Sequence, residues 1–188
     1  ALLAVHMTQV EPEEIELFAG NGAQVVHCPE SNLKLASGYC PVERLLDAGI
    51  NVALGTDGAA SNNDLDMLGE MRSAALQAKG MTADACALPA DQALQMASLN
   101  GARALGIDHE TGSLRIGKSA DIVAVDLSQP ETQPVFNPVS QIVYAAGREQ
   151  VRHVWISGRQ VLKNRALTTI DLVKTLQRAG AWRDRILD

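Results

Sequence analysis

The stretch INVALGTDGAASNND, residues 50–64, decides the fold. Its apolar half, INVAL, has the length and composition of a strand that is buried on both faces. The strand leads to Asp57, and the glycine, alanine, serine and asparagine residues that follow predict a loop where backbone and ligand approach closely. A carboxylate at the end of a buried strand is costly unless a cation or hydrogen bonds compensate its charge. Asp57 is therefore either a metal ligand or an aspartate that caps its own loop.

Two similar apolar runs precede this stretch, LLAVH at residues 2–6 and AQVVH at residues 23–27, and each ends in a histidine. The segments between the runs, residues 11–20 and 41–48, have proline near the start and glycine at or just after the end, which predicts helices. Buried strands that alternate with helices form parallel β/α units rather than hairpins.

Polar residues that can bind a metal stand at the ends of all three predicted strands: His6, His27 and Asp57. The carboxyl ends of parallel strands meet at one edge of a sheet, and the active sites of β/α barrels lie at that edge. We therefore expect these side chains to gather there. Cys28 is not expected to act as a nucleophile with His27, because adjacent strand residues point to opposite faces.

The chain changes character near residue 107. Residues 1–106 are predicted to form the β/α part, and residues 107–188 a small β-rich part that ends in a helix. The elements predicted after residue 64 are helices over 65–80, 90–105 and 170–188 and short strands within 112–127, 141–147 and 151–164.

Composition restricts the function classes. The chain has 188 residues, of which 46% are hydrophobic, and a formal net charge of −6, so we expect a globular, soluble protein without a nucleic-acid surface. No apolar run approaches the roughly 20 residues that span a bilayer, so no membrane partner is expected. Three cysteines without a close-spaced metal pair favour a reducing, cytoplasmic setting over a disulfide framework.

Four motifs carry a family resemblance: VHMTQ (5–9), HCPESNLKL (27–35), LGTDGAASNN (54–63) and GSLRIGKSADIVAVD (112–126). In this order they resemble the amidohydrolase superfamily and, within it, the methylthioadenosine/S-adenosylhomocysteine deaminases. The resemblance implies an α/β fold. It places the chain in the C-terminal part of a (β/α)8 TIM barrel, strands 6 to 8, followed by part of a small β-sandwich and a C-terminal helix.

The resemblance also implies roles for individual residues. Asp57 matches the strand-8 aspartate, which ligates one divalent metal, usually Zn²⁺, and contacts the attacking hydroxide and the substrate. His6 matches the strand-6 histidine, which lies beside the metal and helps to polarise the substrate. His27 matches a family histidine for which substrate contact and a packing or hydrogen-bonding role are both open.

Four further polar residues are expected on two loops at the rim of the pocket: Ser31, Asn32, Ser61 and Asn62. For Ser61 and Asn62 we favour capping of the loop by the side chain.

The implied reaction is hydrolytic deamination of an adenine nucleoside, 5′-methylthioadenosine or S-adenosylhomocysteine, with release of ammonia. The family pattern also requires a His-x-His on strand 1, and a metal-binding histidine on strand 5 with a glutamate three residues later, and none of these motifs occurs in this sequence. We therefore expect the missing N-terminal half of the barrel to come from a longer protein or from a separate chain. A homo-oligomer stays open.

Two alternatives compete with this interpretation. Within the superfamily, the alternative is a chlorohydrolase or a guanine/cytosine-type deaminase, although SNLKL and GTDGAASNN favour the adenine nucleoside. Outside enzymes, the alternative is a catalytically inactive half-barrel that serves as an interaction module, which the absent metal ligands would explain.

Overall fold

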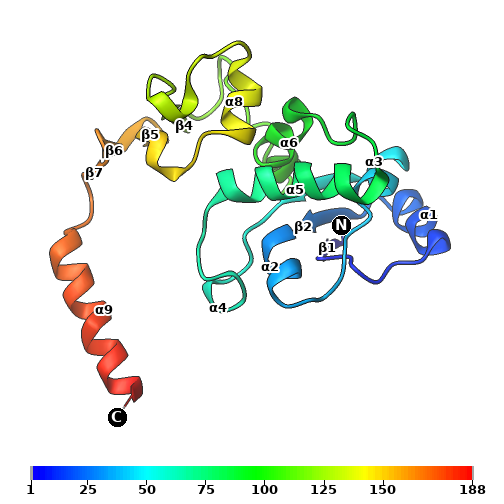
Figure 1. Ribbon diagram of the computed structural model, residues 1–188, viewed down its shortest axis with the longest axis horizontal. Helices are drawn as coiled ribbons and strands as arrows, with labels where there is room; N and C mark the ends of the chain where they lie inside the picture. Colours follow the sequence, from blue (N-terminus) through cyan, green and yellow to red (C-terminus); the bar gives the residue numbers. More distant parts are fainter. Residues whose placement is uncertain (1, 188) are drawn as a thin grey trace.

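The computed structural model describes residues 2–187 (Figure 1). The first part of the chain alternates strands and helices, in the order β1 (Leu3–Val5), α1 (Pro12–Gly20), β2 (Gln24–His27), α2 (Pro29–Lys34), α3 (Val42–Asp47), β3 (Asn51–Leu54), α4 (Ala59–Asn62), α5 (Met67–Thr82), α6 (Ala90–Met96) and α7 (Leu99–Ala104). The second part contains β4 (Ile122–Val125), α8 (Pro138–Tyr144), β5 (Val151–Ile156), β6 (Arg159–Lys163), β7 (Ala166–Leu167) and α9 (Leu172–Leu187), with single 3₁₀ turns at Pro130–Thr132 and Arg148–Gln150.

The first sheet is parallel and has the order β1-β2-β3. Val26 of the central strand lies opposite Val5 on one side and Ala53 on the other, so all three strands end at the same edge. This arrangement confirms the parallel β/α units predicted from the apolar runs and makes the first part of the chain an α/β structure. It also places His6, His27 and Asp57 near one edge of the sheet.

Helices cover one face of this sheet. Val25 and Val52 point toward the helices and are fully buried in a core with Leu45 of α3, Met71 of α5 and Met96 of α6. Alternate residues of a strand point to opposite faces, so Val26 and Ala53 lie on the other face. The helices thereby fix the strands, and the strands in turn fix the position of the residues at their carboxyl ends.

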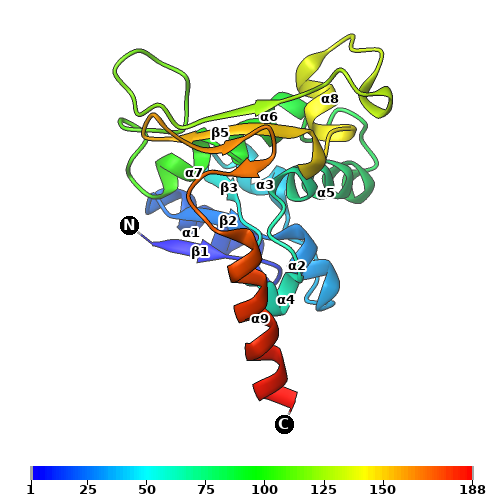
Figure 2. The ribbon, with the colours of Figure 1, turned by 90° about the vertical axis from the view of Figure 1, so that its left-hand side faces the viewer.

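The second sheet is antiparallel, with the order β4-β5-β6-β7. Its β5–β6 hairpin turns through Ser157 and Gly158, whose φ values of 48° and 77° suit a tight hairpin connection. Figure 2 shows this sheet on one side of α6 and α7 and the parallel sheet on the other. Two helices therefore separate the small sheet from the strand ends that carry the polar residues.

Three sequence-based predictions differ from the structure. Residues 141–147, predicted as a strand, belong to helix α8 and the turn after it, because Pro138 and the Asn137 cap, whose Oδ1 accepts from the Ser140 N–H, start a helix there. The helix predicted over 90–105 is broken into α6 and α7 at Ser98, whose hydroxyl donates to the Leu94 carbonyl.

The third difference concerns the two loops that were predicted to rim the pocket. Each is instead a short helix: α2 begins directly after Cys28, and α4 begins directly after Gly58. A helix of one or two turns is too short to show a hydrophobic period in the sequence.

Helix α9 extends away from the rest of the chain (Figures 1 and 2), and none of its described side chains is buried. Leu176, Trp182 and Ile186 are among its exposed apolar residues. Across residues 2–187, no helix combines the length and the apolar character that crossing a membrane requires.

Candidate metal and catalytic site

Asp57 lies just beyond the end of β3 and is held there by hydrogen bonds. Its Oδ2 accepts from the hydroxyls of Ser31, at 2.8 Å, and Ser61, at 2.6 Å, and its Oδ1 accepts from the Gly58 N–H at 2.8 Å. The hydrogen bonds from Ser61, Ser31 and Gly58, in that order, lower the pKa of Asp57 to about 2. The carboxylate is therefore an anion at any physiological pH.

His6 lies next to this carboxylate. It follows β1 directly, and its Nε2 is 3.8 Å from Asp57 Oδ2. Its Nδ1 is 2.8 Å from the Oδ1 of Asn32, which is an acceptor, so neutral His6 carries its proton on Nδ1. The Nε2 lone pair then faces the Asp57 side of the site. Both side chains are partly exposed, 40% for His6 and 31% for Asp57, so a ligand can reach them.

The Asp57 carboxylate fits a divalent cation as one member of a larger ligand set, with the His6 imidazole beside it. Carboxylate oxygen is a zinc donor, and a metal ligand must be deprotonated, as Asp57 is. Of the lone pairs on Asp57, Oδ1 keeps one that none of the three hydrogen bonds uses. Within residues 2–187, no three His, Cys, Asp or Glu side chains lie close enough to hold a metal ion by themselves.

His27 is the least accessible of the three predicted site residues. Its side chain is fully buried, and it shares a face of β2 with the core residue Val25. Neither ring nitrogen has a hydrogen-bond partner within the described part of the chain. Burial, with a smaller contribution from His6, lowers the pKa of His27 to about 4, so the ring is neutral. The structure thus brings His6 and Asp57 together but forms no hydrogen bond from His27 to either.

Cys28 does not form a reactive pair with its neighbour. The residue is buried, and burial is the main cause that raises the pKa of its thiol to about 11. A thiol with that pKa is protonated at neutral pH and is a weak nucleophile.

The side chains that hold Asp57 and His6 come from the two short helices. Ser31 and Asn32 lie on α2 and are nearly fully buried, and Ser61 lies on α4. From the sequence these residues were placed at the rim of the pocket, with loop capping favoured for Ser61. The Ser61 Oγ lies 3.0 Å from the Gly58 carbonyl oxygen of its own turn and 2.6 Å from Asp57 Oδ2, and its single proton serves the shorter contact with Asp57.

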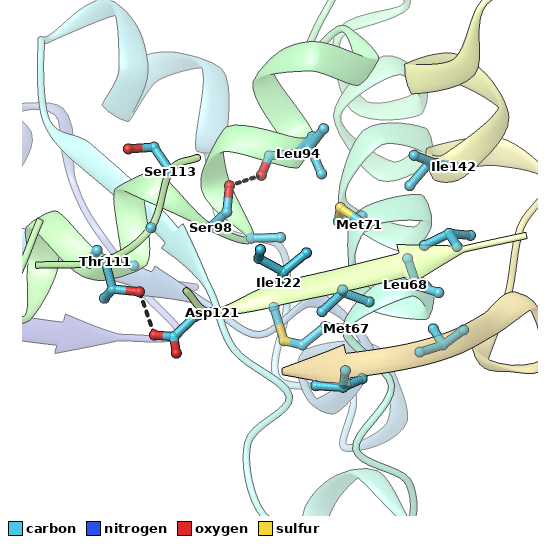
Figure 3. A pocket seen from close by; sticks show the side chains of 18 of the residues that line it. Met67, Leu68, Met71, Leu94, Ser98, Thr111, Ser113, Asp121, Ile122 and Ile142 are labelled. Atoms are coloured by element: carbon cyan, nitrogen blue, oxygen red, sulfur yellow. Dashed lines mark hydrogen bonds between the residues drawn. The ribbon is translucent and has the colours of Figure 1, made fainter. Parts of the chain in front are cut away.

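A cavity of about 1130 Å³ lies elsewhere, between the small sheet and helices α5, α6 and α7 (Figure 3). Its lining is mainly apolar, with Met67, Met71, Leu94 and Ile122 pointing into it. None of the three predicted site residues lines it. The cavity therefore belongs to the packing between the two parts of the chain and not to the site at Asp57.

Comparison with known proteins agrees with this architecture. The sequence model of the amidohydrolase family matches residues 1–161. The chain therefore belongs to the amidohydrolase family, as its motifs predicted.

Individual relatives have more specific names than the family. The chain is 50% identical to a 5-methylthioadenosine/S-adenosylhomocysteine deaminase from Teredinibacter turnerae over 182 residues, which are 97% of this chain and 41% of the relative. It is also 50% identical to a protein of the same name from Moorella thermoacetica, over 90% of this chain and 40% of the relative. The chain thus spans about two fifths of the length of these curated relatives.

Solved structures show the same relation. The crystal structure of an adenosine deaminase from Xanthomonas campestris with bound zinc is 55% identical, with a TM-score of 0.96 over 98% of this chain and 42% of that chain. The atrazine chlorohydrolase TrzN from Arthrobacter aurescens, complexed with zinc, is 29% identical, with a TM-score of 0.88 over 95% of this chain and 40% of that chain.

Proposed function

We propose that this chain is the C-terminal portion of a zinc-dependent enzyme that hydrolytically deaminates adenine nucleosides, with 5′-methylthioadenosine and S-adenosylhomocysteine as substrates. The observation that carries the proposal is the ionised Asp57 carboxylate beside His6 at the end of parallel strands. The names of the relatives that are 50% identical to this chain support the substrate class.

We further propose that the three parallel strands are strands 6 to 8 of a (β/α)8 barrel. Residues 1–106 would then belong to the barrel, and residues 107–188 to a small β-sandwich with a C-terminal helix. The outer edge of β1, which pairs with no other strand within residues 2–187, supports this arrangement, because unpaired ladder groups at a sheet edge favour pairing with a further strand. The metal ligands beyond Asp57 would lie on the strands that complete the barrel.

In the proposed reaction, water adds to the purine carbon that bears the amino group. A new C–O bond forms, the C–N bond breaks, and ammonia leaves. One divalent metal, when bound at Asp57, lowers the pKa of a water and so supplies hydroxide near neutral pH.

Asp57 and His6 would divide the proton transfers of this reaction. Asp57 would accept the proton of the attacking water and later pass a proton to the departing amino group. His6, held at Nδ1 by Asn32, directs Nε2 toward the substrate, and in its protonated form donates a hydrogen bond to the developing negative charge. His27 would act indirectly, because its neutral ring is fully buried at the end of its strand.

The two alternatives receive less support. The chlorohydrolase TrzN is 29% identical to this chain, whereas the proteins with deaminase names are 50% and 55% identical. An inactive interaction module would not need Asp57 to be held as an anion by three hydrogen bonds. We therefore retain deamination as the proposed function.

The test is an assay of ammonia release by the complete protein that contains this chain. We expect turnover of 5′-methylthioadenosine and S-adenosylhomocysteine, and little turnover of guanine or of a chlorotriazine. The variant Asp57→Asn should keep the fold, because asparagine also tolerates a positive φ, but should lose bound metal and turnover. Metal content is measured by elemental analysis of the purified protein.

A matched control is Asp121→Asn. Asp121 also accepts hydrogen bonds from a backbone N–H and a hydroxyl, at Ser157 and Thr111, but lies on the small sheet side of the molecule. Its variant should keep both metal and rate. The proposal is wrong if Asp57→Asn keeps them as well, or if the intact protein binds zinc but deaminates no nucleoside.

A further inference from the structure

Glu70 is a carboxylate that the proposed mechanism does not use, and its side chain is fully buried. It lies near the start of α5, where its Oε1 accepts from Asn62 Nδ2 at 2.6 Å and its Oε2 accepts from the Glu30 N–H at 3.3 Å. The two oxygens of one carboxylate therefore hold two segments that are distant in sequence.

Both of these segments carry the groups that hold Asp57. Asn62 uses its second N–H to donate to the carbonyl of Thr56, the residue directly before Asp57, at 2.8 Å. Glu30 directly precedes Ser31, whose hydroxyl donates to Asp57. Glu70 thus connects the segment that contains Asp57 to the segment that supplies one of its hydrogen-bond donors.

The segment that contains Glu30 also contacts His6. Asn32, which accepts from His6 Nδ1, lies on the same short helix α2 as Glu30 and is nearly fully buried. The Glu30 side chain is itself fixed, because its Oε1 accepts from the Ser73 hydroxyl of α5 at 2.7 Å. The first two turns of α5 therefore hold α2 at two points.

We propose that Glu70 is a positioning residue that sets the distance between Asp57 and His6. It acts through Asn62 and Thr56 on one side, and through the Glu30 N–H and helix α2 on the other. Its effect on turnover rests on the proposed deaminase function. Its effect on the two segments does not.

Packing alone does not explain why a carboxylate occupies this position. Burial of the side chain disfavours its charge and is the main cause that raises its pKa, to about 7. Within residues 2–187 no cationic side chain is paired with it, and the nearby Glu30 and Asp64 raise the pKa further. An apolar side chain would fill the space without this cost, but only a group with two acceptor oxygens satisfies both donors.

The test is Glu70→Gln in the complete, metal-loaded protein. Glutamine has almost the same volume but replaces one acceptor oxygen with an NH₂ group, so either Asn62 or the Glu30 N–H faces another donor. We expect backbone amides of residues 56–62 and 30–32 to exchange with deuterium roughly tenfold faster than in the wild type. We expect kcat to fall roughly 10- to 100-fold with little change in KM or metal content.

Val143→Ala is the matched control. Val143 is fully buried in α8, so its truncation destabilises the fold without touching either segment. This variant should leave kcat and the exchange of residues 56–62 close to wild-type values. The double variant of Glu70→Gln with Asn62→Ala should be little worse than the more damaging single variant, because both changes break one chain of contacts.

The outcomes separate this inference from the proposed function. If the wild-type protein deaminates no nucleoside, the proposed function fails, and the exchange of residues 56–62 alone decides the role of Glu70. If Glu70→Gln exchanges no faster than Val143→Ala in these segments, the inference is overturned, whatever the activity. It is also overturned if an active wild-type protein keeps its kcat in Glu70→Gln.

Discussion

Asp57 owes its low pKa to short contacts with hydroxyl groups, and Ser61 is the largest contributor. Removing this donor in Ser61→Ala destabilises the anion, so the pKa of Asp57 should move from about 2 toward its ordinary value. The measurement is a carboxyl ¹³C NMR titration of the metal-free protein. The control is Ser128→Ala, which removes a similar hydroxyl from Asp126. An unchanged Asp57 titration in Ser61→Ala would contradict the hydrogen-bonded origin of the shift.

His27 and Glu70 should give stability opposite pH dependences. His27 has a folded-state pKa of about 4, below its ordinary 6.5, so the unfolding free energy falls as pH drops through this window. Glu70 has a folded-state pKa of about 7, above its ordinary 4.5, so the unfolding free energy falls as pH rises through that window. Each of these pKa shifts corresponds to roughly 3 kcal/mol of unfolding free energy. Between pH 4.5 and 6.5 the contributions of His27 and Glu70 change in opposite directions.

The two contributions can be separated by urea unfolding of the metal-free protein at a series of pH values. His27→Leu removes the histidine contribution, so the unfolding free energy of this variant, relative to the wild type, should fall as pH rises from 4.5 to 6.5. Glu70→Gln removes the glutamate contribution, so the unfolding free energy of this variant, relative to the wild type, should rise over the same range. Parallel profiles for the wild type and both variants would show that neither group is titrated as the structure requires.

At the residue scale, the sequence predicted Asp57 and His6 as site residues and gave no sign that Glu70 is buried. Asp57 and His6 follow apolar runs, so the end of each predicted strand marks them. Glu70 lies within a predicted amphipathic helix, where an acidic residue normally faces solvent. Its burial depends on Asn62 and Glu30, whose positions follow from two helices too short to be predicted from periodicity.

At the scale of elements, the close packing of β2 against the end of β3 depends on the glycine at position 55. A Cβ added to Gly55 would lie 2.9 Å from Val26 Cγ1, and the branched valine side chain has little freedom to move away. Gly55→Ala should therefore destabilise the protein by about 1–3 kcal/mol. Unfolding in urea measures the change.

The clash itself can be tested with a second substitution. In the Val26→Ala background the clashing methyl group is gone, so Gly55→Ala should cost much less than it does alone. Additive effects of Gly55→Ala and Val26→Ala would mean that the two side-chain positions do not interact.

Elements could be predicted where the local sequence gives a strong signal, such as an apolar run or a helix start and stop. The three parallel strands were predicted from continuous apolar runs, and α1, α3, α5 and α9 from start and stop residues or helical periodicity. The strand predicted over 141–147 was wrong because its apolar residues, including the fully buried Val143, suit a buried helix as well as a strand. The Asn137 cap and Pro138 at the first helical position were the signals that favour the helix over the strand.

At the scale of the whole molecule, α9 should add little to the stability of this chain. Its described side chains are all at least partly exposed, so their removal returns little apolar surface to water. A chain that ends at Ile170 should lose less than about 1 kcal/mol of unfolding free energy. Leu45→Ala, at a fully buried position, should by contrast cost about 2–5 kcal/mol. Thermal unfolding compares them, and a truncation as costly as Leu45→Ala would contradict the exposed position of α9.

Individual strand pairings differ in how far apart in the sequence their partners lie, and this difference should govern the order in which they form. In the antiparallel sheet, β5 and β6 are joined by a tight turn, and such hairpins form in roughly 1–10 μs. In the parallel sheet, Val5 pairs with Val26 and Val26 with Ala53, so each pairing must close a loop that contains a helix. Long-range parallel pairing is intrinsically slow and leaves strand edges exposed while it proceeds. We therefore expect the strand ends that carry His6 and Asp57 to come together only after the β5–β6 hairpin has formed, so that the site is assembled later than the local structure of the small sheet.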